Sequence, residues 1–125
     1  MARSTDADFL LPAGAVELLT ELPADGPFDV VFDTAVLVGP ALAAVRDGGT
    51  YLGVVPSAIP ESVRGISTLA VKSHHDGPRL AGLLAAMAAG ELQARVAGTL
   101  PLADAVQAQA NVEKGAQRGR WVLLP

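Results

Sequence analysis

Apolar residues follow two alternating spacings along this chain. Short runs rich in β-branched and aromatic residues, bounded by Gly, Pro or polar residues, predict strands. These runs cover 8–11, 28–32, 50–55, 66–72, 93–98 and 120–124. Longer stretches between them carry apolar residues three or four positions apart, which predicts helices over 15–22, 37–46, 78–90 and 101–114. Residues 56–65 are predicted to form a loop, in which Arg64 is expected to be solvated.

The helix predicted over 78–90 has the clearest pattern. Its apolar side chains recur at i, i+3, i+4 and i+7 and so share one face: Leu80, Leu83, Leu84 and Met87. Asp76 is placed as its N-cap, Pro78 suits its first turn, and Gly90 suits its end. In the same way, Gly48 and Gly49 are expected to end the helix over 37–46 as a left-handed C-cap.

The order of these elements defines the fold class. Strands that alternate with helices predict an α/β layered protein with a mostly parallel sheet and right-handed crossovers. A chain of 125 residues fits one domain, so we expect residues 1–125 to form a single domain.

Composition excludes several classes of protein. A net charge of −4 with only 18% charged residues does not suit a surface that tracks phosphates, so no nucleic-acid partner is expected. The chain has no cysteine, which excludes disulfides and thiolate chemistry. It also lacks a long apolar run and a signal-peptide pattern, so we expect no membrane span and a cytoplasmic location.

Four segments together resemble the medium-chain dehydrogenase/reductase family. The stretches are 28–34 (FDVVFDT), 43–53 (AAVRDGGTYLG), 94–108 (ARVAGTLPLADAVQA) and 114–125 (KGAQRGRWVLLP). They are similar to the second half of that family's nucleotide-binding domain and to its closing segments, in the family's order. The branch that they resemble is the quinone oxidoreductase and enoyl reductase branch, which carries no zinc.

The resemblance implies a truncated Rossmann-like sheet flanked by helices. The family's GroES-like catalytic domain and its glycine-rich strand–helix–strand unit have no counterpart in this sequence. Backbone N–H groups of that glycine-rich turn hold the pyrophosphate, so the resemblance implies that no cofactor is bound unless a partner chain supplies the missing half for NADPH. The sequence also departs from the family after Thr34, where glycines are often found but Ala35 to Val38 stand here.

Several candidate site residues are expected at one end of the sheet. Ligands of open α/β sheets bind outside the carboxyl ends of the strands. Asp33 is a candidate catalytic residue, and the candidate substrate-binding residues are Thr34, Tyr51, Gly53 and Val55. Alternatively, Asp33 and Thr34 cap the next helix and Tyr51 simply packs.

His74 and His75 are the other candidate catalytic residues. Histidine titrates nearest to neutral pH, so a pair beside a strand end suits general acid–base catalysis. Both are alternatively surface residues of a turn. No metal site is predicted, because two adjacent histidines without a spaced third ligand are a weak signal.

Three functions follow from these observations. The first is a redox-neutral enzyme of specialised metabolism, such as a cyclase, isomerase or dehydratase, that acts on a small apolar molecule by acid–base chemistry. The second is a subunit of a split NAD(P)H-dependent quinone or enoyl oxidoreductase. The third is a non-catalytic binding module.

A homodimer is expected in each case. Half of the residues are apolar, and the strand predicted from Ile66 to Lys72 carries few charges that would block edge pairing. In the family that the chain resembles, the equivalent strand pairs across a dimer axis.

Overall fold

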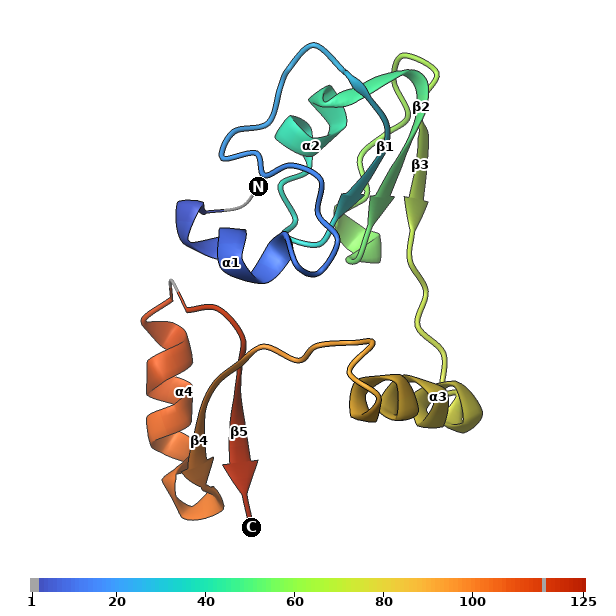
Figure 1. The fold of residues 1–125 in the computed structure, drawn as a ribbon. Coiled ribbons are helices and arrows are strands. Elements are labelled where there is room, and N and C mark those ends of the chain that lie inside the picture. Colours follow the sequence, from blue (N-terminus) through green and yellow to red (C-terminus); the bar gives the residue numbers. More distant parts are fainter. Residues whose placement is uncertain (1–2, 116) are drawn as a thin grey trace. The chain divides into compact units, whose positions relative to one another are not determined.

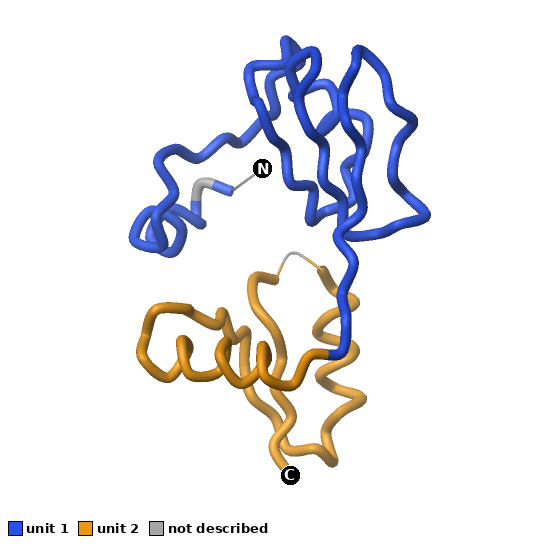
Figure 2. The backbone as a smooth tube through the Cα atoms, turned by 90° about the vertical axis from the view of Figure 1, so that its right-hand side faces the viewer, with its two compact units in different colours: residues 1–75 blue, residues 76–125 orange. Residues whose placement is uncertain are grey.

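The computed structural model describes residues 3–115 and 117–125 and divides the chain into two compact units, residues 1–75 and 76–125 (Figures 1 and 2). Each unit contains its own parallel sheet, with three strands in the first and two in the second. The α/β fold class with parallel sheets flanked by helices is therefore confirmed. The expectation of a single domain over the whole chain stays a prediction.

The first unit holds a sheet in the order β1-β2-β3. Its elements are η1 (Ser4–Asp6), α1 (Ala7–Leu10), β1 (Phe28–Asp33), α2 (Gly39–Ala43), β2 (Val45–Gly53), η2 (Pro56–Ala58) and β3 (Ser67–Ala70). Both strand pairs are parallel. The strands predicted over 28–32, 50–55 and 66–72 are thus confirmed, with boundaries that differ by a few residues.

The core of the first unit lies on one face of this sheet. Alternate strand residues point to opposite faces, and the inner face is packed against α2. Four residues form the buried cluster: Ala41, Val45, Tyr51 and Ile66. The opposite face is uncovered within this unit, where Val30, Phe32 and Leu69 are each more than half exposed.

Two predicted elements before β1 are wrong. Residues 8–11 were expected to be a strand, but α1 covers most of them, because a run of four residues is too short to distinguish the two periods. The helix expected over 15–22 is irregular. Of its apolar residues, Leu22 packs against the core whereas Val16 is fully exposed, and so short a helix is not stable without a packed face.

The helix predicted over 37–46 ends early. β2 begins at Val45, so Gly48 and Gly49 lie inside a strand and do not form a C-cap. The register between β1 and β2 shifts at this point, and Gly48 has the left-handed φ of +71° that such an irregularity requires. The N–H group of Gly48 is bonded to the carbonyl of Arg64 at 3.0 Å, which fixes the bulge.

The second unit pairs β4 and β5 in parallel. Its elements are α3 (Gly77–Ala88), β4 (Val96–Pro101), η3 (Leu102–Asp104), α4 (Ala105–Glu113) and β5 (Arg120–Leu124). The Asp76 carboxylate caps α3 by accepting the N–H of Arg79 at 2.9 Å, as predicted. The strand predicted over 93–98 is displaced toward the C-terminus, because Thr99 to Pro101 continue the pairing with β5.

No helix in the described part of the chain is both long and apolar enough to cross a membrane.

Candidate functional site

The carboxyl ends of the three strands of the first unit meet at one edge (Figure 1). Asp33 is in register with Gly53, and Gly53 is in register with Ala70. The residues that follow each strand therefore share this edge, which we call the carboxyl edge. It comprises residues 33–38, 53–55 and 70–71. Edges of this kind are where open parallel sheets bind ligands.

Asp33 is the most highly connected side chain at this edge. Its carboxyl group is buried and accepts three hydrogen bonds, one from the N–H of Ala35 at 3.0 Å, one from the N–H of Val38 at 2.8 Å and one from the Tyr51 hydroxyl at 2.9 Å. Asp33 therefore ties the loop after β1 to the next strand of the sheet.

The hydrogen bonds decide the charge of Asp33. Burial raises the pKa of its carboxyl group, but hydrogen bonds from the following loop and from Tyr51 outweigh that effect, so the pKa lies below its ordinary value. Burial, together with the hydrogen bond and the negative charge of Asp33, raises the pKa of Tyr51 to about 12. At neutral pH the pair consists of a carboxylate and a neutral phenol.

Gly53, two positions after Tyr51, lies close to the Tyr51 side chain. Tyr51 is 1% exposed. A Cβ atom at Gly53 would lie 2.7 Å from the end of the Ile59 side chain and 3.3 Å from the Tyr51 hydroxyl, so a larger residue would require these side chains to shift. Glycine thus leaves room for the Tyr51 hydroxyl that donates to Asp33. The predicted roles of Tyr51 and Gly53 in binding substrate stay predictions.

The loop from Thr34 to Val38 has a strained backbone. Val36 and Val38 have φ angles of +58° and +54°. Such conformations cost a β-branched residue about 1–3 kcal/mol each and persist only where the surroundings enforce them. Hydrogen bonds to a carboxylate are worth about 1.5–3 kcal/mol each, so those of Asp33 are sufficient to offset the strain.

The rim of the carboxyl edge is apolar. Four valines follow the three strand ends and are each 37–45% exposed: Val36, Val54, Val55 and Val71. The predicted substrate-binding residues Thr34 and Val55 are both exposed at this rim. An uncharged, flat or aliphatic ligand matches such a surface better than a phosphate does.

His74 and His75 lie between β3 and α3. Both are exposed, and the structure gives neither a hydrogen-bond partner among the described residues. Asp33 is enclosed by its three bonds, so no hydrogen bond joins the three predicted catalytic residues. Their catalytic roles stay predictions.

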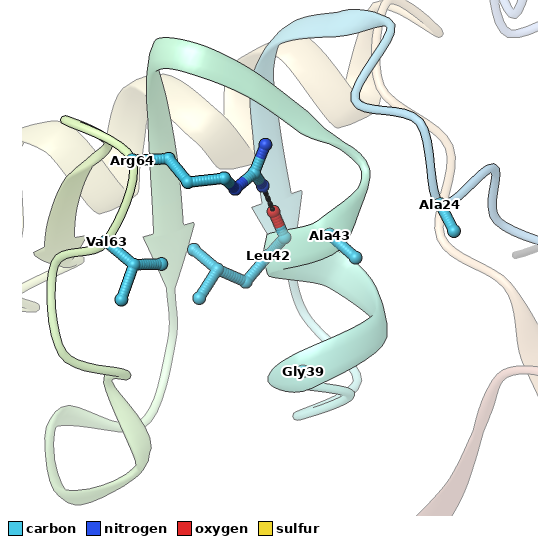
Figure 3. A pocket seen from close by; sticks show the side chains of 6 residues that line it. All are labelled: Ala24, Gly39, Leu42, Ala43, Val63 and Arg64. Atoms are coloured by element: carbon cyan, nitrogen blue, oxygen red, sulfur yellow. Dashed lines mark hydrogen bonds between the residues drawn. The ribbon is translucent and has the colours of Figure 1, made fainter.

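A hollow of about 370 Å³ lies along α2, and none of the predicted site residues lines it (Figure 3). Ala24, Gly39, Leu42, Ala43, Val63 and Arg64 line it. The terminal nitrogens of Arg64 already donate to Asp47 and to the carbonyls of Leu42 and Val45, at 2.8, 2.9 and 3.0 Å. The expectation of a merely solvated Arg64 is therefore wrong, since its guanidinium joins α2, β2 and the 56–65 loop.

The sequence did not predict the left-handed backbone of Val36 and Val38 or the hydrogen bonds of Arg64. The valines occupy the segment in which the resembled family often has glycines, and that difference was the available signal for a left-handed backbone. Nothing in the sequence near Arg64 indicated its carbonyl partners, because they lie about 20 residues earlier, at the junction of α2 and β2.

Comparison with known proteins defines the class of the chain. The family model described as zinc-binding dehydrogenase matches residues 4–123, and the chain belongs to this family. The dehydrogenase-like resemblance read from the sequence is thereby confirmed at the level of the family. No curated protein and no solved structure shows significant similarity to the chain.

The family description raises the question of zinc. The chain contains no cysteine, and the described residues include no cluster of three or more potential metal ligands. Structural zinc sites use four ligands and catalytic sites three, mostly Cys, His and carboxylates. The donor set in the described residues does not fit zinc.

The lowered pKa of Asp33 predicts a loss of stability in acid. A carboxyl group whose folded pKa lies below 3.8 contributes stability above about pH 4, and this contribution is lost as the pH falls through the folded pKa. The unfolding free energy of the wild type, measured with urea, is expected to fall below pH 4. Asp33→Asn should be about 2 kcal/mol less stable at pH 7 and less dependent on pH.

Asp25→Asn is the matched control, because Asp25 is an exposed carboxylate in the same unit. It should keep the wild-type stability and pH profile. A wild-type profile for Asp33→Asn would show that the bonded carboxylate does not stabilise this unit.

Proposed function

We propose that this chain supplies the nicotinamide- and substrate-facing wall of a nicotinamide-dependent oxidoreductase, and that another chain holds the phosphates of the dinucleotide. The observation that carries this proposal is the carboxyl edge. There, exposed valines form an apolar rim, and the Asp33 carboxylate accepts hydrogen bonds from N–H groups of the 34–38 loop. Membership of a dehydrogenase family supports the class of reaction.

The apolar rim suits the reacting half of such an enzyme. A nicotinamide ring and a quinone or an α,β-unsaturated carbonyl compound are flat and uncharged over most of their surface. Val36, Val54, Val55 and Val71 would pack against them and exclude water. Bound reduced nicotinamide supplies a hydride, and the acceptor takes it together with a proton from solvent.

The hydrogen bonds and the negative charge of Asp33 disfavour phosphate binding at the same loop. Loops that hold pyrophosphate present free backbone N–H groups to it. Here the N–H groups of Ala35 and Val38 are bonded to the Asp33 carboxylate. A phosphate would have to displace that carboxylate and would be repelled by its charge. This is why we assign the phosphates to a partner chain, as in a split NAD(P)H-dependent quinone or enoyl oxidoreductase.

The redox-neutral acid–base enzyme is the weaker alternative. An acid–base catalyst needs a pKa near the working pH and access to the substrate. Asp33 is buried, with its pKa lowered, and its oxygens accept three hydrogen bonds. Cyclase, isomerase or dehydratase chemistry would have to rest on His74 and His75.

The proposal predicts how two nicotinamide compounds bind. Reduced nicotinamide mononucleotide lacks the adenosine half of NADPH. It should bind the isolated chain with a Kd on the order of millimolar. NADPH should bind within about threefold of that value, because the additional phosphates gain no partner. NMR of valine-labelled protein measures both affinities. The resonances of the rim valines should shift on binding, whereas that of Val30, on the exposed face of the same sheet, should not.

Two variants make this test specific. Val55→Asp, on the rim, should abolish the shifts, whereas Val30→Asp, on the exposed face of the same sheet, should preserve them. NADPH that binds a hundredfold more tightly than the mononucleotide would place the phosphate site within this chain and contradict the proposal.

We further propose that two copies pair through β3. Among the described residues, β3 is an edge strand with β2 on one side. The N–H of Val71 is bonded to the carbonyl of Gly53 at 2.8 Å, so the backbone of Val71 and of alternate residues before it faces β2. The N–H groups of Thr68 and Ala70 consequently face the open edge, where a second strand would be bound.

The dimer has a direct test in light scattering. The wild type is expected to have twice the monomer mass at micromolar concentration. Ala70→Pro removes one outward N–H group without touching the β2 ladder, and should be monomeric with its near-UV spectrum preserved. Ala70→Val keeps that N–H group and should remain dimeric. A monomeric wild type, or a dimeric Ala70→Pro variant, would refute edge pairing.

A further inference from the structure

We infer that Asp33 and Tyr51 are positioning residues that hold the 34–38 loop in its strained form, and that Val36, presented by this loop, determines which ligands fit the apolar rim. This inference rests on the proposed function of the carboxyl edge for its ligand. Its structural half, the positioning of the loop by Asp33 and Tyr51, rests on geometry alone.

The loop is fixed at three points. Asp33 binds the N–H groups of Ala35 and Val38. Leu37 packs against the buried core, and the carbonyl of Val38 accepts the N–H of Leu42 at 2.8 Å where α2 begins. These contacts on both sides of Val36 and at Val38 oppose a change of the loop to negative φ. We therefore assign the strain to these surroundings.

Val36 is the large apolar side chain of this loop that is exposed, beside the exposed Thr34 and Ala35. Its neighbour Leu37 is drawn into the core, while Val36 remains 45% exposed beside the ends of the other strands. A valine at φ +58° is unfavourable for the fold, and glycine would adopt this conformation without strain. The backbone conformation thus favours glycine over valine at this position, and the exposed position of the Val36 side chain on the rim points to ligand contact.

Tyr51 completes the arrangement from the neighbouring strand. Its hydroxyl donates to the same carboxylate oxygen, Oδ2, that accepts the N–H of Val38. Gly53 leaves the space in which the phenol lies. Loss of the hydroxyl is expected to let the carboxylate rotate and to loosen its hold on Val38, without opening a cavity in the core.

A double-mutant cycle in the full-length protein tests the structural half. Val38→Gly should raise the urea midpoint in the wild-type background, because it relieves strain. In Asp33→Asn the loop is already released, so the same change should gain less. The coupling should be about tenfold in the unfolding equilibrium constant. Additive effects, within about twofold, would overturn the positioning role.

Binding of reduced nicotinamide mononucleotide tests the ligand half. Val36→Gly should stabilise the protein yet weaken this binding by about fivefold to tenfold, since one apolar side chain is lost from the rim. Tyr51→Phe should weaken binding by a similar factor while the far-UV spectrum is preserved. Val16→Gly, at a fully exposed position of the same unit, should not change the affinity.

The outcomes separate this inference from the proposed function. A merely structural role for Val36 predicts a stabilised protein with unchanged affinity, and that result would overturn the assignment of specificity. If the wild type does not bind the mononucleotide, the proposed function fails together with the specificity of Val36. The double-mutant cycle then still decides whether Asp33 positions the loop.

Discussion

A buried carboxylate with three donors is the interaction on which the first unit depends. Asp33 stands at the last position of β1 and accepts hydrogen bonds from the following loop and from Tyr51 of the next strand. Removal of a charge from water is unfavourable unless its oxygens are satisfied, and here the donors satisfy them. The same bonds set the charge of Asp33, order the loop and occupy the N–H groups that a phosphate would need.

This constraint connects the fold with the proposed chemistry. A parallel sheet brings its carboxyl ends to one edge, and the registers of Asp33, Gly53 and Ala70 align them. Asp33 fixes the loop after β1 by hydrogen bonds, and the exposed valines of the rim form an apolar surface. Under the proposed function, this arrangement would give a member of a dehydrogenase family an apolar wall for a nicotinamide ring and its acceptor, without a phosphate cradle at this loop.

Sequence patterns predicted the fold class because several elements carry their own signals. The FDVVFD run made β1 recognisable, and Asp76 marked the start of α3. The strand at 45–49 was not predictable, because its bulge is fixed by a carbonyl of Arg64 that lies far along the chain. The irregular path of 15–22 follows from the absence of a packed face, which periodicity alone does not reveal.

The candidate site was predictable in place but not in function. The sequence pattern placed Asp33 at the carboxyl end of its strand, and the structure confirms this position. Its hydrogen bonds were not predictable, since they require Val36 and Val38 to take left-handed conformations that valine disfavours. Tertiary contacts overrode the local preference of the backbone. For Asp33, first considered as an acid or base, we propose a positioning role.

A spectrophotometric titration of Tyr51 tests the central interaction most directly. The chain has one tyrosine, so tyrosinate absorbance reports this residue alone. A folded pKa raised above the ordinary 10.0 means that the neutral phenol contributes stability below pH 10, which is lost as the pH rises through the folded pKa. The account predicts a midpoint of about 12 for the wild type and a lower one for Asp33→Asn. A midpoint of 10.0 with the far-UV spectrum of the folded protein intact would contradict it.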